Sequence, residues 1–177
     1  MNKERTLSSQ LIYEGRVVRL RIDTVQLPSG RETTREIVEH SDCVAMVPVD
    51  GNGNLLLVKQ FRQAVAKELL EIPAGGIDTG EDPITAVRRE MQEETGYLPQ
   101  KMERLGGFYS SPGFSTEYMH LYLATDLVPS QLYAEDTESI KLIPVSPAEI
   151  PRLIASGTIC DAKSIIGLRA FLEGRKG

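Results

Sequence analysis

The chain has 177 residues, 41% of them hydrophobic, and a formal net charge of −5. This length is typical of a single globular domain with a sizeable core, and the acidic balance argues against a nucleic-acid partner, because nonspecific binding needs a basic surface. No apolar run is long enough to cross a membrane, and the N-terminus lacks the apolar stretch of a signal peptide. Cys43 and Cys160 do not make a disulfide framework, so we expect two packed thiols and a cytoplasmic protein without a membrane partner.

Residues 1–40 predict a small antiparallel β-meander. Alternating apolar and polar residues indicate strands at 11–13, 17–26 and 33–39, and Pro-Ser-Gly at 28–30 is typical of a turn. Such a sheet has one apolar face that needs a partner, either within its own domain or on a second copy of the chain.

The remaining residues alternate between strands and helices. Nearly continuous apolar runs at 43–49 and 55–61 flank Asp-Gly-Asn-Gly-Asn, a pattern that predicts a hairpin. A short strand is expected at 68–72. Further strands are expected at 102–109, 118–124 and 140–145, and helices at 147–156 and 162–172, with Gly157 as a helix end and Asp161 as an N-cap. These elements predict a mixed α/β sandwich.

The most informative segment, 75–97, predicts a short helix that follows a glycine-rich turn. Asp82 is a good N-cap, and Pro83 suits the first helical position because no partner is needed there for its missing N–H. Gly96 suits the position just after the helix, where the backbone often turns left-handed. One apolar stripe, at roughly 100° per residue, is expected to face the core: Ile84, Val87 and Met91.

The same helix carries three clustered carboxylates, Glu90, Glu93 and Glu94. Like charges at this spacing repel each other, so a divalent cation between them is the simplest explanation. Mg²⁺ prefers oxygen ligands of this kind, and Arg89 is placed to pair with a carboxylate. Acidic residues on a helix are usually no more than an exposed face, so the carboxylates alone do not decide between the two interpretations.

The surrounding residues resemble the signature of the Nudix hydrolases. That signature is G-x5-E-x7-R-E-U-x-E-E-x-G-U, where U is a bulky apolar residue, and every fixed position from Gly75 through Glu81 to Gly96 is present, with Tyr97 at the last U. The resemblance implies the Nudix fold, an α/β (α+β) fold in which a mixed β-sheet is sandwiched between helices. It also implies two parts: an N-terminal antiparallel β subdomain at 1–40, which forms a homodimer, and a Nudix domain at 41–177.

The resemblance further implies hydrolysis of a nucleoside diphosphate linked to another group, with Mg²⁺ as cofactor and Mn²⁺ as a substitute. The implied metal ligands are the carboxylates of Glu90, Glu93 and Glu94 and the backbone carbonyl of Ala74. Glu93 and Arg89 are assigned to the catalytic group.

The substrate is indicated by residues outside this helix. Ser-Ser-Pro-Gly-Phe-Ser-Thr-Glu at 110–117 resembles the marker of ADP-ribose and ADP-sugar pyrophosphatases, although Pro-Gly alone is ordinary turn chemistry. Segments 58–62, 71–75 and 157–164 resemble the same branch. Arg62 is expected to bind phosphate, and Glu117 the hydroxyls of the terminal ribose. The implied substrate-binding residues are Arg62, Gly75, Pro112, Gly113 and Glu117.

In this branch of the family the general base comes from an acidic loop. Glu138 is the favoured residue because it is nearest the following strand, and Glu135 and Asp136 are the alternatives; the acidity could also serve solubility alone. The expected reaction yields AMP and ribose 5-phosphate from ADP-ribose. The alternatives are another ADP-sugar, GDP-mannose or a dinucleotide polyphosphate as substrate, and, ranked lower, a non-catalytic ADP-ribose sensor.

Overall fold

The computed structural model describes residues 3–134, 137 and 139–174. The chain divides into two compact units. One unit comprises Met1–Asp42 and Tyr109–Tyr118, and the other comprises Cys43–Phe108 and Met119–Gly177. Among the helices of the described residues, none is both long and apolar enough to cross a membrane.

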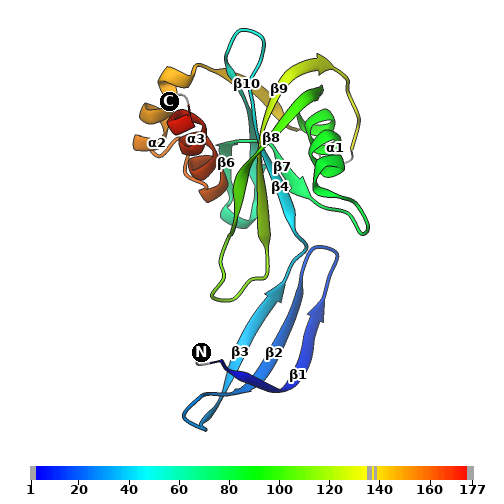
Figure 1. The fold of residues 1–177 in the computed structure, drawn as a ribbon, viewed down its shortest axis with the longest axis vertical. Coiled ribbons are helices and arrows are strands. Elements are labelled where there is room, and N and C mark those ends of the chain that lie inside the picture. The colour runs from blue at the N-terminus through cyan, green and yellow to red at the C-terminus, as the bar shows by residue number, and fades with distance from the viewer. Residues whose placement is uncertain (1–2, 135–136, 138, 175–177) are drawn as a thin grey trace. The chain divides into compact units, whose positions relative to one another are not determined.

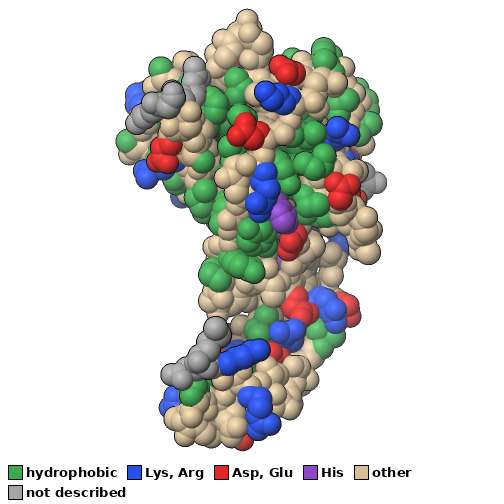
Figure 2. Space-filling model, viewed as in Figure 1, with side chains coloured by type: hydrophobic (Ala, Val, Ile, Leu, Met, Phe, Trp, Pro, Cys, Tyr) green, Lys and Arg blue, Asp and Glu red, His purple; other side chains and the backbone are tan. Residues whose placement is uncertain are grey.

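The first unit contains an antiparallel three-stranded sheet of β1 (Arg5–Glu14), β2 (Arg19–Gln26) and β3 (Glu32–Glu39). The three expected strands are therefore confirmed, and β1 is longer than its short apolar core indicated. All ten residues of β1 are exposed. Figure 2 shows basic and acidic side chains next to one another on this unit, in agreement with ion pairs such as Arg35–Glu4 at 2.6 Å.

The second unit contains two sheets. One is mixed, in the order β7-β4-β9-β8: β4 (Cys43–Pro48) pairs antiparallel with β7 (Ala74–Gly76) and parallel with β9 (Tyr118–Pro129). The other is antiparallel, in the order β10-β5-β6. The remaining strands of the unit are β5 (Leu55–Arg62), β6 (Lys67–Glu71), β8 (Tyr97–Tyr109) and β10 (Lys141–Val145).

Helices cover the mixed sheet on both faces (Figure 1). Side chains alternate along β4, so Val44 and Met46 pack with the helix α1 (Pro83–Thr95), whereas Ala45 and Val47 pack with α2 (Ile150–Ala155) and α3 (Ala162–Gly174). All six residues of β4 are buried. This is the expected mixed sheet between helices.

Helix α3 approaches the sheet closely at Gly167. A Cβ at this position would lie 2.9 Å from Cδ1 of Ile72 and 3.1 Å from side-chain atoms of Leu121 and Val47. The absence of a side chain therefore lets the helix backbone pack directly on the core.

The predicted hairpin at 50–54 is half right. The turn forms, because Asp50 Oδ1 accepts hydrogen bonds from the backbone N–H groups of Asn52 at 2.9 Å and Asn54 at 2.8 Å. The two flanking strands, however, belong to different sheets and share only an isolated bridge between Val49 and Leu55. Strand β4 pairs with β7 and β9, whereas β5 pairs with β10 and with β6, the next strand in the chain.

Two other expectations are wrong. Ile84 is 36% exposed, and the third buried residue of the α1 stripe is Ala86, beside Val87 and Met91. Position 84 lies in the first turn of α1, at the edge of the buried face. Cys160 is exposed, and only Cys43 is a packed thiol. Among unpredicted elements, β7 is three residues long, too short for a periodic pattern.

Candidate active site

Helix α1 begins and ends as its sequence predicts. Asp82 Oδ1 accepts hydrogen bonds from the backbone N–H groups of Ile84 at 2.9 Å and Thr85 at 3.1 Å. Gly96 follows the helix with a left-handed φ of 76°, and its N–H donates to the carbonyl of Gln92. Both ends are thus fixed, which places the carboxylates of the last two turns.

Arg89 organises three carboxylates. Its Nε and Nη2 atoms donate to the two oxygens of Glu81 at 3.0 and 2.8 Å, and its Nη1 donates to Glu90 at 2.6 Å and Glu93 at 3.2 Å. Nη2 also donates to the carbonyl of Gly76 at 2.8 Å. The hydrogen bonds from Arg89 lower the pKa of Glu81 despite partial burial. The expected pairing of Arg89 with a carboxylate is confirmed.

Glu90 lies directly against the backbone of Gly75. A Cβ on Gly75 would lie 2.0 Å from Cδ of Glu90, so only glycine leaves room for this carboxylate. Glu90 is 9% exposed, and its burial raises its pKa although Arg89 opposes the shift. A buried carboxylate with an elevated pKa is not part of an ordinary exposed helix face.

Glu94 is held from β7 by a hydrogen bond from the backbone N–H of Ala74 to its Oε2 at 3.0 Å. Burial raises the pKa of Glu94 to about 8; the charge of Glu90 adds to the shift, and the bond from Ala74 opposes it. The structure therefore brings together Ala74, Gly75, Glu90 and Glu94 from two elements that are adjacent in space.

The donor set fits a divalent metal ion. The cluster contains one guanidinium and four carboxylates, so an excess of negative charge remains at the site. The oxygens of Glu90, Glu93 and Glu94 are the hard ligands that Mg²⁺ prefers. Burial raises the pKa of Glu90 and of Glu94, and a cation bound between them would stabilise their ionised forms.

A pocket of about 480 Å³ adjoins this cluster. Glu93 and Glu94 line it together with Gln131, Ala134 and Thr137, and among the described residues that line it none is basic. The candidate bases Glu135, Asp136 and Glu138 lie outside the described residues, although their described neighbours Ala134 and Thr137 belong to the pocket wall.

Gln131 connects this pocket to the C-terminal end of α1. Its Nε2 donates to the carbonyls of Gln92 at 3.1 Å and Glu93 at 3.3 Å. The neighbouring Ser130 donates its N–H to the carbonyl of Gly96 at 2.8 Å. The bonds to Glu93 and Gly96 reach carbonyls of the helix end, where partners within the helix run out, and the carbonyl of Gln92 also accepts from the N–H of Gly96. Sequence reasoning missed Gln131 because nothing local to position 131 indicates a contact with residue 92.

Arg62 pairs with a buried carboxylate that sequence reasoning did not single out. Its Nε and Nη2 donate to the two oxygens of Glu71 at 3.0 and 2.7 Å, and Lys163 donates to the same carboxylate. Glu71 is 1% exposed. A polar residue in the otherwise apolar stretch 69–72 was the one available indication of this contact.

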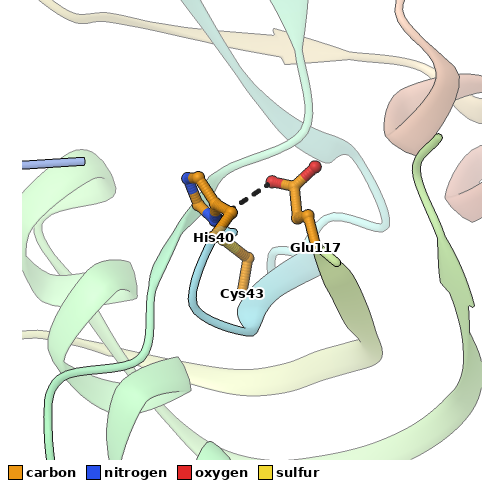
Figure 3. Close-up of side chains that lie close together, drawn as sticks. All are labelled: His40, Cys43 and Glu117. Carbon is orange, nitrogen blue, oxygen red and sulfur yellow. Dashed lines mark ion pairs between the residues drawn. The ribbon is translucent and has the colours of Figure 1, made fainter. Parts of the chain in front are cut away.

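Three sequence-predicted substrate residues, Pro112, Gly113 and Glu117, belong to the first unit. Pro112 and Gly113 line a pocket of about 230 Å³ with Arg21 and Arg35. Figure 3 shows the Glu117 carboxylate directed toward the ring of His40, with Oε1 3.9 Å from Nδ1. The structure thus assembles these residues around a turn that is bonded to the end of β3.

Comparisons with known proteins agree with this geometry. Residues 39–163 match the NUDIX domain, and residues 4–38 match the nucleoside diphosphate sugar hydrolase N-terminal domain. The chain is 38% identical over 169 residues to a methanol dehydrogenase activator of Bacillus methanolicus, covering 94% of this chain and 91% of that protein. It is 34% identical over 169 residues to an ADP-ribose pyrophosphatase of Bacillus subtilis, with the same coverage.

Among solved structures, an ADP compounds hydrolase is similar to the whole chain, with a TM-score of 0.91 and coverage of 100% of this chain and 96% of that one. The sequence identity is 21%, so this likeness concerns the fold. The family match covers most of the chain and includes every residue of the carboxylate cluster described above. The chain belongs to the Nudix family.

Proposed function

We propose that this protein is an ADP-ribose pyrophosphatase, which hydrolyses ADP-ribose to AMP and ribose 5-phosphate in the presence of Mg²⁺. The observation that carries the proposal is the clustering of Glu90, Glu93 and Glu94 on α1, with Gly75 leaving room for Glu90. The names of relatives such as the Bacillus subtilis protein support ADP-ribose as the substrate. Nudix hydrolases generally use divalent metal ions, and Mg²⁺ suits an all-oxygen site best.

Glu90, Glu93, Glu94 and the carbonyl of Ala74 would hold the metal. When bound, it would neutralise the diphosphate charge and favour in-line attack by water. Arg89 fixes the rotamers of Glu90 and Glu93, so that their oxygens converge without a reorganisation cost at the moment of reaction. This role is supported by its bonds to Glu90 and Glu93.

The loop at 134–139 would supply the general base, with Glu138 favoured and Glu135 or Asp136 as alternatives. The base must lie within one water of the attacked phosphorus to accept a proton from the nucleophile. Support comes from Ala134 and Thr137, which line the pocket that also contains Glu93 and Glu94.

The substrate would be held by Arg62, Gly75, Pro112, Gly113 and Glu117. A guanidinium suits phosphate because it donates two parallel hydrogen bonds. A carboxylate such as that of Glu117 suits a ribose, because it accepts from two neighbouring hydroxyls. Arg62 remains 39% exposed, which supports contact with a ligand.

We also propose a homodimer formed through the N-terminal β subdomain, residues 1–40. The support is the exposure of apolar side chains on β1, including Leu11 at 47%, Ile12 at 47% and Tyr13 at 58%, because an exposed apolar row of this kind favours association. Light scattering should give twice the chain mass, and Ile12→Glu should yield the monomer. A cytoplasmic location is proposed because Cys43 and Cys160 are not joined in a disulfide.

A substrate panel tests the activity. Wild-type protein and Glu94→Gln are compared with Mg²⁺ and with Mn²⁺ on ADP-ribose, another ADP-sugar, GDP-mannose and a dinucleotide polyphosphate, and the products are identified by chromatography. We expect AMP and ribose 5-phosphate from ADP-ribose, and a loss in kcat/KM of about 100-fold or more in the variant. If another compound gives a higher kcat/KM than ADP-ribose, that compound replaces ADP-ribose as the proposed substrate. Tight ADP-ribose binding by calorimetry with no turnover would indicate a sensor instead.

A further inference from the structure

Glu71 is the centre of a buried ionic network in the second unit. Its Oε1 accepts from Arg62 Nε, and its Oε2 accepts from both Arg62 Nη2 and Lys163 Nζ. Lys163 also donates to Asp161 Oδ1 at 2.9 Å. The two positive and two negative charges of this network therefore cancel. The four side chains come from strands β5 and β6 and from the beginning of α3.

A buried ionic network of this kind is not explained by stability alone. Burying charges costs free energy, and an apolar set of the same volume is often at least as stable. The burial of Glu71 would raise its pKa, but the hydrogen bonds from Arg62 and the charge of Lys163 outweigh this effect and lower it. Glu71 is therefore a carboxylate at neutral pH, and it fixes its partners by charge-assisted bonds.

The contacts define how Arg62 is oriented. In the strand ladder Glu71 is opposite Val58, and Arg62 is opposite Lys67, so the Arg62 side chain must extend along the sheet to reach Glu71. Both contacts use one edge of the guanidinium, Nε and Nη2. The other edge, Nη1, makes no hydrogen bond to the described residues, and 39% of the side chain is exposed.

The segment that follows Glu71 links the network to the carboxylates of α1. The N–H of Ile72 donates to Ser164 Oγ of α3 at 2.9 Å, and the N–H of Ala74 donates to Glu94 at 3.0 Å. A stretch of four residues thus bonds in turn to Arg62, to α3 and to Glu94. The guanidinium that Glu71 orients and the carboxylate of Glu94 are held by one piece of backbone.

We propose that Glu71 is a positioning residue for diphosphate binding: it clamps one edge of the Arg62 guanidinium, with Lys163 bracing the clamp from α3, so that the Nη1 edge is presented to a phosphate. This inference rests on the proposed role of Arg62 in substrate binding. Glu71 and Lys163 act through Arg62 and do not themselves touch the substrate.

A double-mutant cycle tests the proposal, because it separates action through Arg62 from a general loss of structure. The variants are Glu71→Gln, Arg62→Ala and the double variant; Glu68→Gln is the matched control, since Glu68 is on the same strand and pairs with Lys59 at 2.8 Å on the surface. Two readouts are the KM and kcat for ADP-ribose and the Kd of ADP measured by calorimetry. The Kd does not depend on turnover, so it tests the inference even if ADP-ribose is not hydrolysed.

We expect Glu71→Gln to raise KM and Kd about tenfold, with kcat changed less than about threefold, and Glu68→Gln to leave all three unchanged. The double variant should equal Arg62→Ala alone. Additive effects, or an Arg62→Ala variant that binds ADP like the wild type, would overturn the proposal. If Glu71→Gln does not fold, Lys163→Gln replaces it in the same cycle, with a smaller rise in Kd that must vanish in the Arg62→Ala background.

Discussion

Gly75 and Glu90 occupy one space: the carboxylate of Glu90 lies where a side chain at position 75 would begin, 2.0 Å from the ideal Cβ position. The turn before α1 and the third turn of the helix are therefore matched to each other. Since φ of Gly75 is not positive, the glycine is needed here for space and not for backbone conformation.

Gly75→Ala should disable the site without straining the backbone. The new methyl group must displace Glu90 and with it the bond from Arg89, so we expect kcat/KM to fall by about 100-fold and Mg²⁺ to bind more weakly. Gly51→Ala is the control, because no atom lies within 4 Å of its Cβ position and its φ is also not positive. Steady-state kinetics and a Mg²⁺ titration measure both effects. Equal activity of the two variants would contradict the expectation.

The stability of the metal-free protein should depend on the protonation of Glu94. Its pKa is about 8 in the folded state against an ordinary value of 4.5, so between these values the folded chain binds a proton that the unfolded chain releases. Stability therefore falls as pH rises through this window, by at most about 1.4 kcal/mol per pH unit. Urea unfolding in a chelator should show this fall for wild type, relative to Glu94→Gln. Parallel pH profiles would refute it.

Addition of Mg²⁺ should release that proton. At pH 7 Glu94 is largely protonated without metal, because its pKa is about 8, and a metal ligand must be ionised. Calorimetric titrations in buffers of different ionisation enthalpy should therefore report proton release in wild type at pH 7, less at pH 9, and none from this group in Glu94→Gln. Binding without proton release at pH 7 would show that Glu94 is already ionised or is not a ligand.

Arg89→Met should be more harmful than the same substitution at the neighbouring arginine. It leaves the buried carboxylate of Glu90 without a cation, which costs about 3 kcal/mol, whereas the exposed Arg88→Met should change the unfolding free energy by less than about 0.5 kcal/mol. Arg89→Lys should restore only part of the stability, because an ammonium has three donors on one nitrogen, whereas the guanidinium makes five hydrogen bonds from three nitrogens. Urea denaturation without metal compares the three variants, and similar unfolding free energies for Arg88→Met and Arg89→Met would contradict this.

Gln131→Ala should destabilise the C-terminal end of α1. The substitution removes the donor to two backbone carbonyls, and each such bond contributes about 1 kcal/mol. Gln100→Ala, an exposed glutamine of β8, is the control. Hydrogen exchange of the last turn of α1 should accelerate in Gln131→Ala only. Unchanged exchange rates would mean that water takes over the hydrogen bonds of the Gln131 amide without a loss of stability at the helix end.

The parts of the fold that depend on local chemistry were predictable. Asp82, Pro83 and Gly96 define α1 through capping and backbone geometry, which are properties of a few neighbouring residues. The clustering of Glu90 and Glu93 near Arg89 likewise follows from the spacing of residues on one helix, whereas Glu81 reaches Arg89 from the turn before the helix. The exposure of Ile84 did not follow, because a residue at the edge of a stripe is buried only if the sheet beneath extends that far.

The parts that depend on distant partners were not predictable. The turn at 50–54 has hairpin chemistry, but strands buried on both faces do not record which neighbour they pair with, so the separation of β4 and β5 into two sheets could not be inferred. Glu71 and Gln131 contact residues that are 92 and 39 positions away. A single charged residue in an apolar strand indicates that a partner exists without indicating which one.

Gly167 has a consequence for the charged network one helical turn before it. Because this residue has no side chain, α3 lies against Ile72, Leu121 and Val47, and that depth brings the ammonium of Lys163 within bonding reach of Glu71. A methyl group at position 167 would lift the helix and lengthen an ionic contact that it does not touch. The size of a residue in the apolar core thereby sets, through Glu71, the orientation of Arg62, the arginine that we propose binds the substrate.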